Sequence, residues 1–156
     1  MAFPAGARPG LRSLQQGLGL IEVLLAVVIL SIGLLGLASL QGNSLKFSHS
    51  AYLRTQATQL AYDIADRMRA NRQATLAGSY AIAMSDTPLN NPGNRVDIDK
   101  AEWLNSLANV LPNGDGSVVL DTSNGYSARA TITVQWTDDR TGEDVATEQF
   151  VFETEI

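Results

Sequence analysis

The feature that most constrains this chain is an apolar run from Leu18 to Leu40. Its 23 residues are apolar with six exceptions: Gly19, Glu22, Ser31, Gly33, Gly36 and Ser39. As a helix, the run would span roughly 34 Å, enough to cross a hydrocarbon core of about 30 Å. We therefore expect one transmembrane helix that begins at Leu18 and ends at Leu40.

The residues before this run, 1–17, form a short basic leader. They contain Arg8 and Arg12, no acidic residue and no apolar stretch of their own. A small polar junction, Gln15 to Gly17, lies before the apolar run, so cleavage there would leave the membrane segment attached. Because positive residues favour the cytoplasmic side, we expect a cytoplasmic N-terminus and export of everything after Gly42.

Charge and composition exclude several classes of function. The net charge of −5 becomes −7 without Arg8 and Arg12, and such an acidic domain disfavours nucleic acid as a partner. The chain has no cysteine and one histidine, His49, which removes thiolate sites, histidine-based triads and multi-histidine metal sites. We therefore expect no enzyme activity, no cofactor and no metal.

Beyond Gly42 the helical pattern continues with one apolar face. Its apolar positions recur at steps of three and four: Leu53, Ala57, Leu60, Ala61, Ile64, Ala65 and Met68. The other face is polar, and Asp63 and Arg67 have the spacing of an i,i+4 ion pair. With no proline between residues 18 and 73, the pattern predicts one continuous helix, with 43–73 as its amphipathic half.

The next segment, 74–98, is rich in glycine, proline and asparagine and predicts a long irregular loop. This loop is either a partner-facing surface or simply flexible, and the two readings are about equally supported. Asp99 followed by Glu102 is a capping-box pattern, and it predicts a short helix that Pro112 stops.

The C-terminal part, 116–156, predicts an antiparallel meander of three strands. Apolar and polar residues alternate from Tyr126 to Trp136, between less regular strands at Val118 to Leu120 and Val145 to Glu155. The apolar face of such a sheet needs a cover, which the amphipathic helix provides. The expected fold is α+β, with a leader (1–17), a transmembrane or assembly segment (18–42) and an exported globular domain (43–156).

Glu22 is the one charged residue inside the apolar run. A carboxylate in lipid costs on the order of 3 kcal/mol or more, so it needs a partner or a route to water. Cleavage after Gly17 would create an α-amino group on Leu18, a cation that could meet Glu22 of a neighbouring subunit. The alternative is a carboxylate that reaches the membrane interface from a helix start.

These residues, GLGLIEVLLAVVILSIGLLGLASLQ from Gly17 to Gln41, resemble the class III signal of type IV pilins. That signal typically runs Gly, Phe, a small or polar residue, Leu, Ile, Glu, so Leu18 and Gly19 differ from the commonest residues. The resemblance implies cleavage between Gly17 and Leu18 by a prepilin peptidase, N-methylation of Leu18 and a role of Glu22 in assembly. It also implies the pilin architecture, a long N-terminal helix packed on a small antiparallel sheet.

The remainder is similar to the PilV-type minor pilins through Ala101 to Val118 and the closing strands. This resemblance implies a subunit that starts in the inner membrane and passes into a motility or adhesion pilus. Its partners would be other minor pilins, the major pilin and a tip adhesin. The alternatives are a minor pseudopilin of type II secretion and, in another class, a membrane-tethered periplasmic binding module.

Four further groups have ordinary interpretations. The acidic turns at Asn113 to Gly116 with Asp121, and at Asp138 to Asp144, resemble incomplete calcium loops and are more simply hairpin turns. Three arginines near a helix end, Arg67, Arg69 and Arg72, suit the helix dipole. Trp103 and Trp136 are expected in the core.

Overall fold

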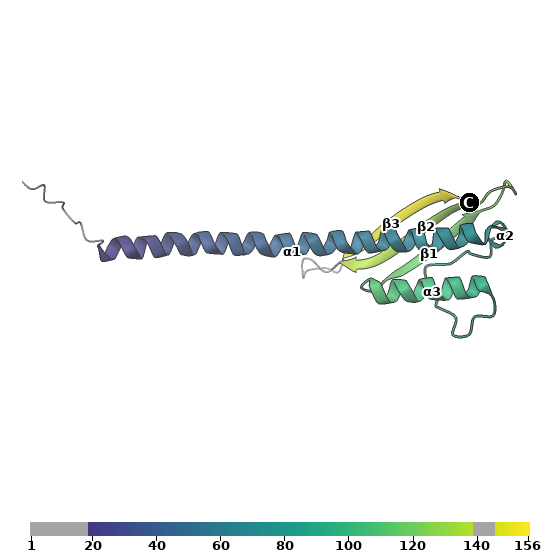
Figure 1. Ribbon diagram of the computed structural model, residues 1–156, viewed down its shortest axis with the longest axis horizontal. Coiled ribbons are helices and arrows are strands. Elements are labelled where there is room, and N and C mark those ends of the chain that lie inside the picture. The colour runs from purple at the N-terminus through teal and green to yellow at the C-terminus, as the bar shows by residue number, and fades with distance from the viewer. Residues whose placement is uncertain (1–18, 139–145) are drawn as a thin grey trace, which may run out of the picture. The chain divides into compact units, whose positions relative to one another are not determined.

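The computed structural model describes residues 19–138 and 146–156 (Figure 1). The chain divides into two compact units, one ending at Gly42 and one comprising Asn43–Ile156. Helix α1, Leu20–Ala70, contributes residues to both units. The three strands and the other two helices belong to the second unit.

Helix α1 ends earlier than the pattern predicts. The continuous helix expected to residue 73 stops at Ala70, and a five-residue helix, α2, follows at Arg72–Leu76. Between them, Asn71 has φ −121° and ψ 53°, outside the helical region. Asn71 still donates its N–H to Arg67 O at 3.1 Å, so the last hydrogen bond of the helix is kept where the helical conformation ends.

The sheet has three antiparallel strands in the order β1-β2-β3, as the sequence predicts. The strands are β1, Asp115–Asp121, β2, Arg129–Asp138, and β3, Ala146–Glu155. Every second residue of β2 is buried, which confirms the alternation. The prediction for Tyr126 is wrong, because the residue lies in the turn before β2, next to Gly125 with φ 70°, and is 86% exposed.

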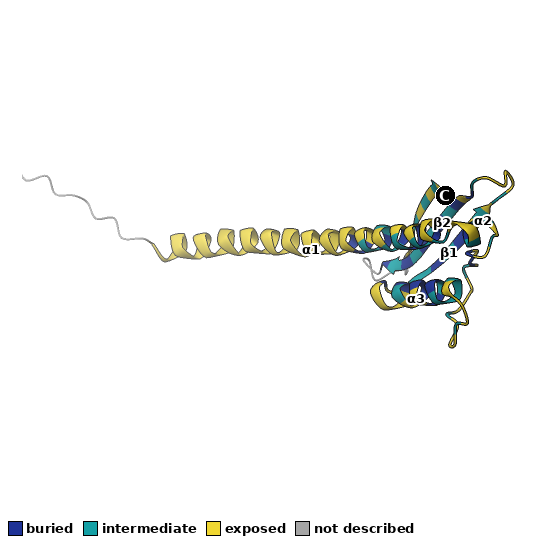
Figure 2. Cartoon of the chain, turned by 45° about the vertical axis from the view of Figure 1, so that its right-hand side comes forward, coloured by how far each residue is buried: buried dark blue, intermediate teal, exposed yellow. Residues whose placement is uncertain are grey.

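The core of the second unit lies between one face of α1 and the inner face of the sheet. Figure 2 shows α1 changing from fully exposed to alternately buried along its length. The predicted stripe is confirmed: six of its seven residues are buried, and Leu60 is partly buried and packed on the same core. Opposite the stripe, β2 contributes the small side chain of Ala130 and larger ones at Ile132, Val134 and Trp136.

Helix α3, Arg95–Val110, begins four residues before the predicted start at Asp99. Its N-cap is Asn94, whose side chain accepts a hydrogen bond from Asp97 N at 3.0 Å. Asp99 lies inside the helix and is 2% exposed. The irregular segment is therefore shorter than the predicted 74–98, because α2 extends to Leu76 and α3 starts at Arg95.

The end of α3 is as predicted, at Val110 ahead of Pro112. The turn into β1 is tight: a Cβ on Gly114 would lie 2.2 Å from Leu107 O. The chain can take this path only with glycine at that position.

Candidate functional site

The first unit presents an apolar helical surface that no described part of the chain covers. Every described residue from Gly19 to Gly42 is exposed. By length and composition α1 could cross a membrane, and none of its most apolar stretch is buried. Burial of apolar surface is worth about 25 cal/mol per Å². The free energy of this helix is therefore lower in lipid, or packed against other apolar helices, than in water.

Glu22 lies in the first turn of this surface. At this helix start the backbone N–H groups of Glu22 and Val23 donate to Gly19 O at 2.9 and 3.3 Å. Within residues 19–138 and 146–156, the carboxylate of Glu22 has no hydrogen-bond or ion-pair partner. An acidic group near a helix N-terminus is favoured by the dipole, but in an apolar surrounding it also needs a cation.

One other polar side chain of this segment is satisfied within the helix itself. Ser31 returns its hydroxyl to the helix, donating to Val27 O at 2.7 Å. Gly33 and Gly36 have open space where a Cβ would be, so no contact among the described residues requires glycine there. Glycine inside a helix costs about 1 kcal/mol relative to alanine, and small residues permit close approach of a second helix.

Two of the predicted site residues, Gly17 and Leu18, lie outside the described residues. Cleavage between them and methylation of Leu18 therefore remain predictions. Leu40, the predicted end of the membrane span, lies within α1 and is exposed.

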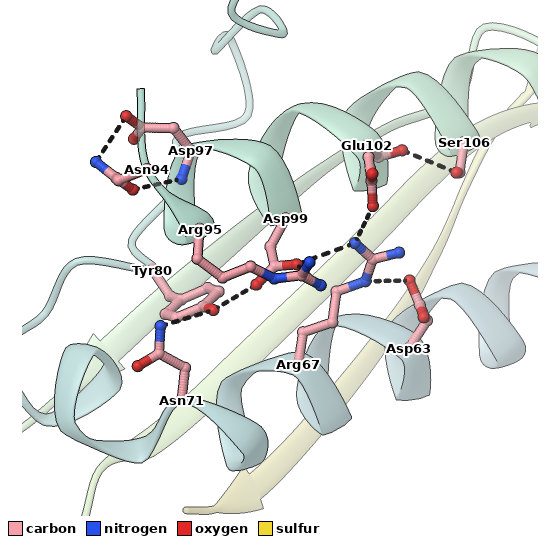
Figure 3. Close-up of polar contacts among 10 residues, drawn as sticks. All are labelled: Asp63, Arg67, Asn71, Tyr80, Asn94, Arg95, Asp97, Asp99, Glu102 and Ser106. Atoms are coloured by element: carbon pink, nitrogen blue, oxygen red, sulfur yellow. Dashed lines mark hydrogen bonds and ion pairs between the residues drawn. The ribbon is translucent and has the colours of Figure 1, made fainter. Parts of the chain in front are cut away.

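In the globular unit, a cluster of polar and charged side chains joins α1 to α3 (Figure 3). Arg67 Nε lies 3.0 Å from Asp63 Oδ2, which confirms the predicted i,i+4 pair. Its Nη1 lies 2.6 Å from Glu102 Oε2 and 3.2 Å from Asp99 Oδ1. Burial alone would lower the pKa of Arg67, but the hydrogen bond to Glu102 and the charges of Asp63, Glu102 and Asp99 raise it.

The buried carboxylate of Asp99 is the centre of this cluster. Its Oδ1 also lies 2.7 Å from Arg95 Nη2, and its Oδ2 accepts a hydrogen bond from Tyr80 OH at 2.6 Å (Figure 3). Burial and this hydrogen bond raise the pKa of Tyr80 to about 12. Asp99, which belongs to α3, is thereby connected to α1 through Arg67 and to the segment after α2 through Tyr80.

The three arginines near the end of α1 do more than balance the helix dipole. Beside the contacts of Arg67, Arg69 bonds Asp66 at 2.8 Å and Thr154 Oγ1 at 2.7 Å, and Arg72 donates to Tyr126 O. These contacts attach the helix end to β3 and to the β1–β2 turn. The dipole interpretation is therefore incomplete, because it omits partners far away in the sequence.

The tryptophans are in the core, as predicted, but their indole groups differ. Trp103 is fully buried, and its Nε1 donates to Leu60 O at 2.9 Å. Trp136 is equally buried, yet its Nε1 has no hydrogen-bond partner in the part of the chain that the structure describes. A buried unpaired N–H costs about 1–3 kcal/mol.

In the first candidate calcium segment, Asp115, Gly116 and Asp121 lie in β1, and Asn113 and Gly114 connect α3 to β1 instead of forming the predicted hairpin turn. Asp121 Oδ1 accepts from Ser123 N at 3.0 Å, and this backbone hydrogen bond lowers the pKa of Asp121. Among residues 19–138 and 146–156 no three acidic, histidine or cysteine side chains converge on a metal position. The second turn lies mostly outside the described residues. His49 is exposed and borders an apolar pocket of about 730 Å³ with Leu45, Leu53 and Pro112.

Comparison with known proteins identifies one feature of the chain. Searches of the curated proteins and of the solved structures found no match. Residues 12–38 match the family model described as the prokaryotic N-terminal methylation motif. That range includes the predicted cleavage position, Glu22 and most of the exposed apolar helix. The chain therefore carries the prepilin signal of type IV pilin-like proteins.

Proposed function

We propose that this chain is a minor pilin, a structural subunit that enters or primes a type IV pilus after a prepilin peptidase removes residues 1–17. The cut would free the α-amino group of Leu18, which is then methylated. The 18–42 segment would hold the precursor in the inner membrane and afterwards pack among the helices of other subunits. The acidic domain, 43–156, would reside in the periplasm and then on the filament.

The observation that carries the proposal is the combination at the start of α1. A methylation motif at residues 12–38 coincides with the exposed apolar half of α1, whose one acidic side chain, Glu22, has no partner among the described residues. A subunit contact can supply the missing cation, because attraction between charges is strong where water is excluded. An anchor that only held a domain to the membrane would gain nothing from this costly carboxylate.

The test replaces Glu22 by glutamine or alanine in a strain that makes the filament. Both variants are expected to insert into the membrane normally and to fall at least tenfold in sheared filaments, since their charge-free side chain cannot attract the Leu18 amine. Val23→Ala, a change at an exposed neighbour, is the matched control and is expected to assemble. Recovery of Glu22→Gln in filaments at the wild-type level would contradict the proposal.

The main rival is a minor pseudopilin of type II secretion, because the same motif and the same helix serve both. Deletion of the gene separates the two roles: loss of surface pili with normal secretion supports the minor pilin, and the reverse supports the pseudopilin. The proposed partners are the peptidase, the major pilin and other minor pilins, with a tip adhesin as a further candidate.

A further inference from the structure

The two edges of the sheet differ in the part of the chain that the structure describes. The outer edge of β1 is partly closed by Ile82, whose N–H donates to Val118 O at 3.0 Å and whose O accepts from Val118 N at 2.9 Å. The outer edge of β3 has no strand beside it among residues 19–138 and 146–156. From this edge we propose that β3 is a docking strand, which receives an antiparallel extended segment of another protein with a basic residue opposite Glu155.

The direction of the backbone groups follows from the register of β2 and β3. Ala128 and Ile156 exchange both of their hydrogen bonds, at 3.0 and 2.9 Å, so they form a hydrogen-bonded pair. Such pairs alternate along an antiparallel ladder, and Phe150 and Phe152 therefore bond to β2. The intervening Gln149, Val151 and Glu153 direct their N–H and C=O groups to the outer edge.

Strand β3 has neither proline nor a bulge, which are two of the features that usually block pairing. Natural edge strands are also protected by charged side chains or by a covering helix or loop. The pairing of β2 with β3 continues without a bulge from Arg129↔Glu155 to Asp138↔Ala146. Val151 lies at the centre of the strand and is 53% exposed. Gln149 is its neighbour on the same face of the strand. The acidic residues of β3 lie away from the centre: Glu148 is towards one end, 2.8 Å from Arg54, and Glu153 and Glu155 are towards the other.

The same strand indicates the chemistry of its partner. On the β2 side, Arg129 lies opposite Glu155, and Thr131 and Thr133 lie opposite Glu153 and Val151. A strand on the outer edge meets the same row of side chains in the same antiparallel register. A basic residue near its N-terminal end and β-branched residues after it give favourable cross-strand pairs.

Contacts with α1 hold β3 in place. Arg69 bonds Thr154 Oγ1 at 2.7 Å, Arg54 lies 2.8 Å from Glu148, and the rings of Tyr62 and Phe152 are 4.7 Å apart. A strand that is held in place before binding loses less conformational entropy when a partner adds to it.

The test uses the full-length protein in detergent micelles and a labelled peptide that copies β2, residues 129–138. The expected result is saturable binding, with exchange of the Gln149, Val151 and Glu153 amides slowed at least tenfold and the Phe150 amide unchanged. The same peptide N-methylated at alternate residues cannot form the ladder and is expected not to bind.

Val151→Pro removes an outward N–H and no bond to β2, so it is expected to keep the circular dichroism spectrum and abolish binding. Val151→Thr is the matched control and should bind. Glu155→Lys should weaken binding about tenfold, since it places a positive charge opposite the arginine of the peptide that corresponds to Arg129. Equal binding of the N-methylated peptide, or slow exchange at all three amides without peptide because two copies pair, would overturn the proposal.

Discussion

The two halves of α1 differ in how far their apolar side chains are exposed to water. From Leu20 to Gly42 every residue is exposed, although most are apolar. From Asn43 to Ala70 the apolar residues form a stripe, seven residues are buried and the polar face carries ion pairs. An amphipathic stripe is satisfied by one sheet, whereas a helix that is apolar on all sides needs apolar neighbours all around it.

The two halves of α1 are therefore suited to different surroundings. The second half finds its partners in its own chain, chiefly β2 and α3. The first half finds none among the described residues, which is why its function is proposed to lie in lipid and then in a bundle of subunits. Substitutions should accordingly destabilise the domain only where the chain packs on itself.

The largest effect is expected at Ile64. This residue is fully buried, and Ile64→Ala should lower the free energy of unfolding of the domain by about 3 kcal/mol. Ile29→Ala, in the exposed half, should leave that value unchanged within error. Urea unfolding in micelles, followed by the fluorescence of the two buried tryptophans, measures both variants. Equal losses would break the distinction between the two halves.

A second pair compares glycines. Gly114→Ala forces a Cβ against Leu107 O and should cost roughly 2–3 kcal/mol in the same unfolding measurement. Gly36→Ala meets open space and should leave the domain unchanged while it raises the helicity of the first half by circular dichroism. A stable Gly114→Ala variant would show that the turn after α3 is looser than described.

The third prediction concerns pH. The pKa of Tyr80, about 12, lies above the ordinary value of 10, so its contribution is present below about pH 10 and is lost as the pH rises towards 12. Tyr80→Phe should cost about 1–2 kcal/mol at neutral pH, because Asp99 loses a hydrogen bond, and should remove that part of the alkaline decline. Tyr126→Phe, at an exposed tyrosine, is the control. Identical urea midpoints for Tyr80→Phe and wild type from pH 8 to 11.5 would contradict the assignment.

The smallest effect separates the two tryptophans. Both substitutions by phenylalanine remove similar buried area, but Trp103→Phe also loses the indole hydrogen bond to Leu60 O, whereas Trp136→Phe removes an N–H that has no partner among the described residues. Trp103→Phe should therefore be the more destabilising by about 1 kcal/mol. The opposite order in urea unfolding would mean that Trp136 Nε1 has an acceptor outside the described residues.

Much of this fold follows from local patterns. The stripe from Leu53 to Met68, the alternation in β2 and the stop before Pro112 each depend on neighbours in sequence, and each is confirmed. The start of α3 was missed although a signal was present, since Asn94 three residues before Asp97 is itself a capping pattern. Asp99 looked like a cap because a short acidic residue suits that position.

Other features depend on contacts that local pattern does not contain. Asp99 is buried because Arg67, Arg95 and Tyr80 converge on it from three segments. Tyr126 continued the alternation of β2 in sequence, but the turn at Gly125 places it outside the strand. The importance of Glu22 could be inferred early, because a lone carboxylate in an apolar run is anomalous by itself.

The most direct test of the account is the intact mass of the protein extracted from membranes that contain or lack the prepilin peptidase. With the peptidase, we expect a chain that begins at Leu18 and carries one added methyl group. Without it, the mass should be that of the whole chain from Met1. A chain that still begins at Met1 in the presence of the peptidase, or one cut beyond residue 40, would contradict the account.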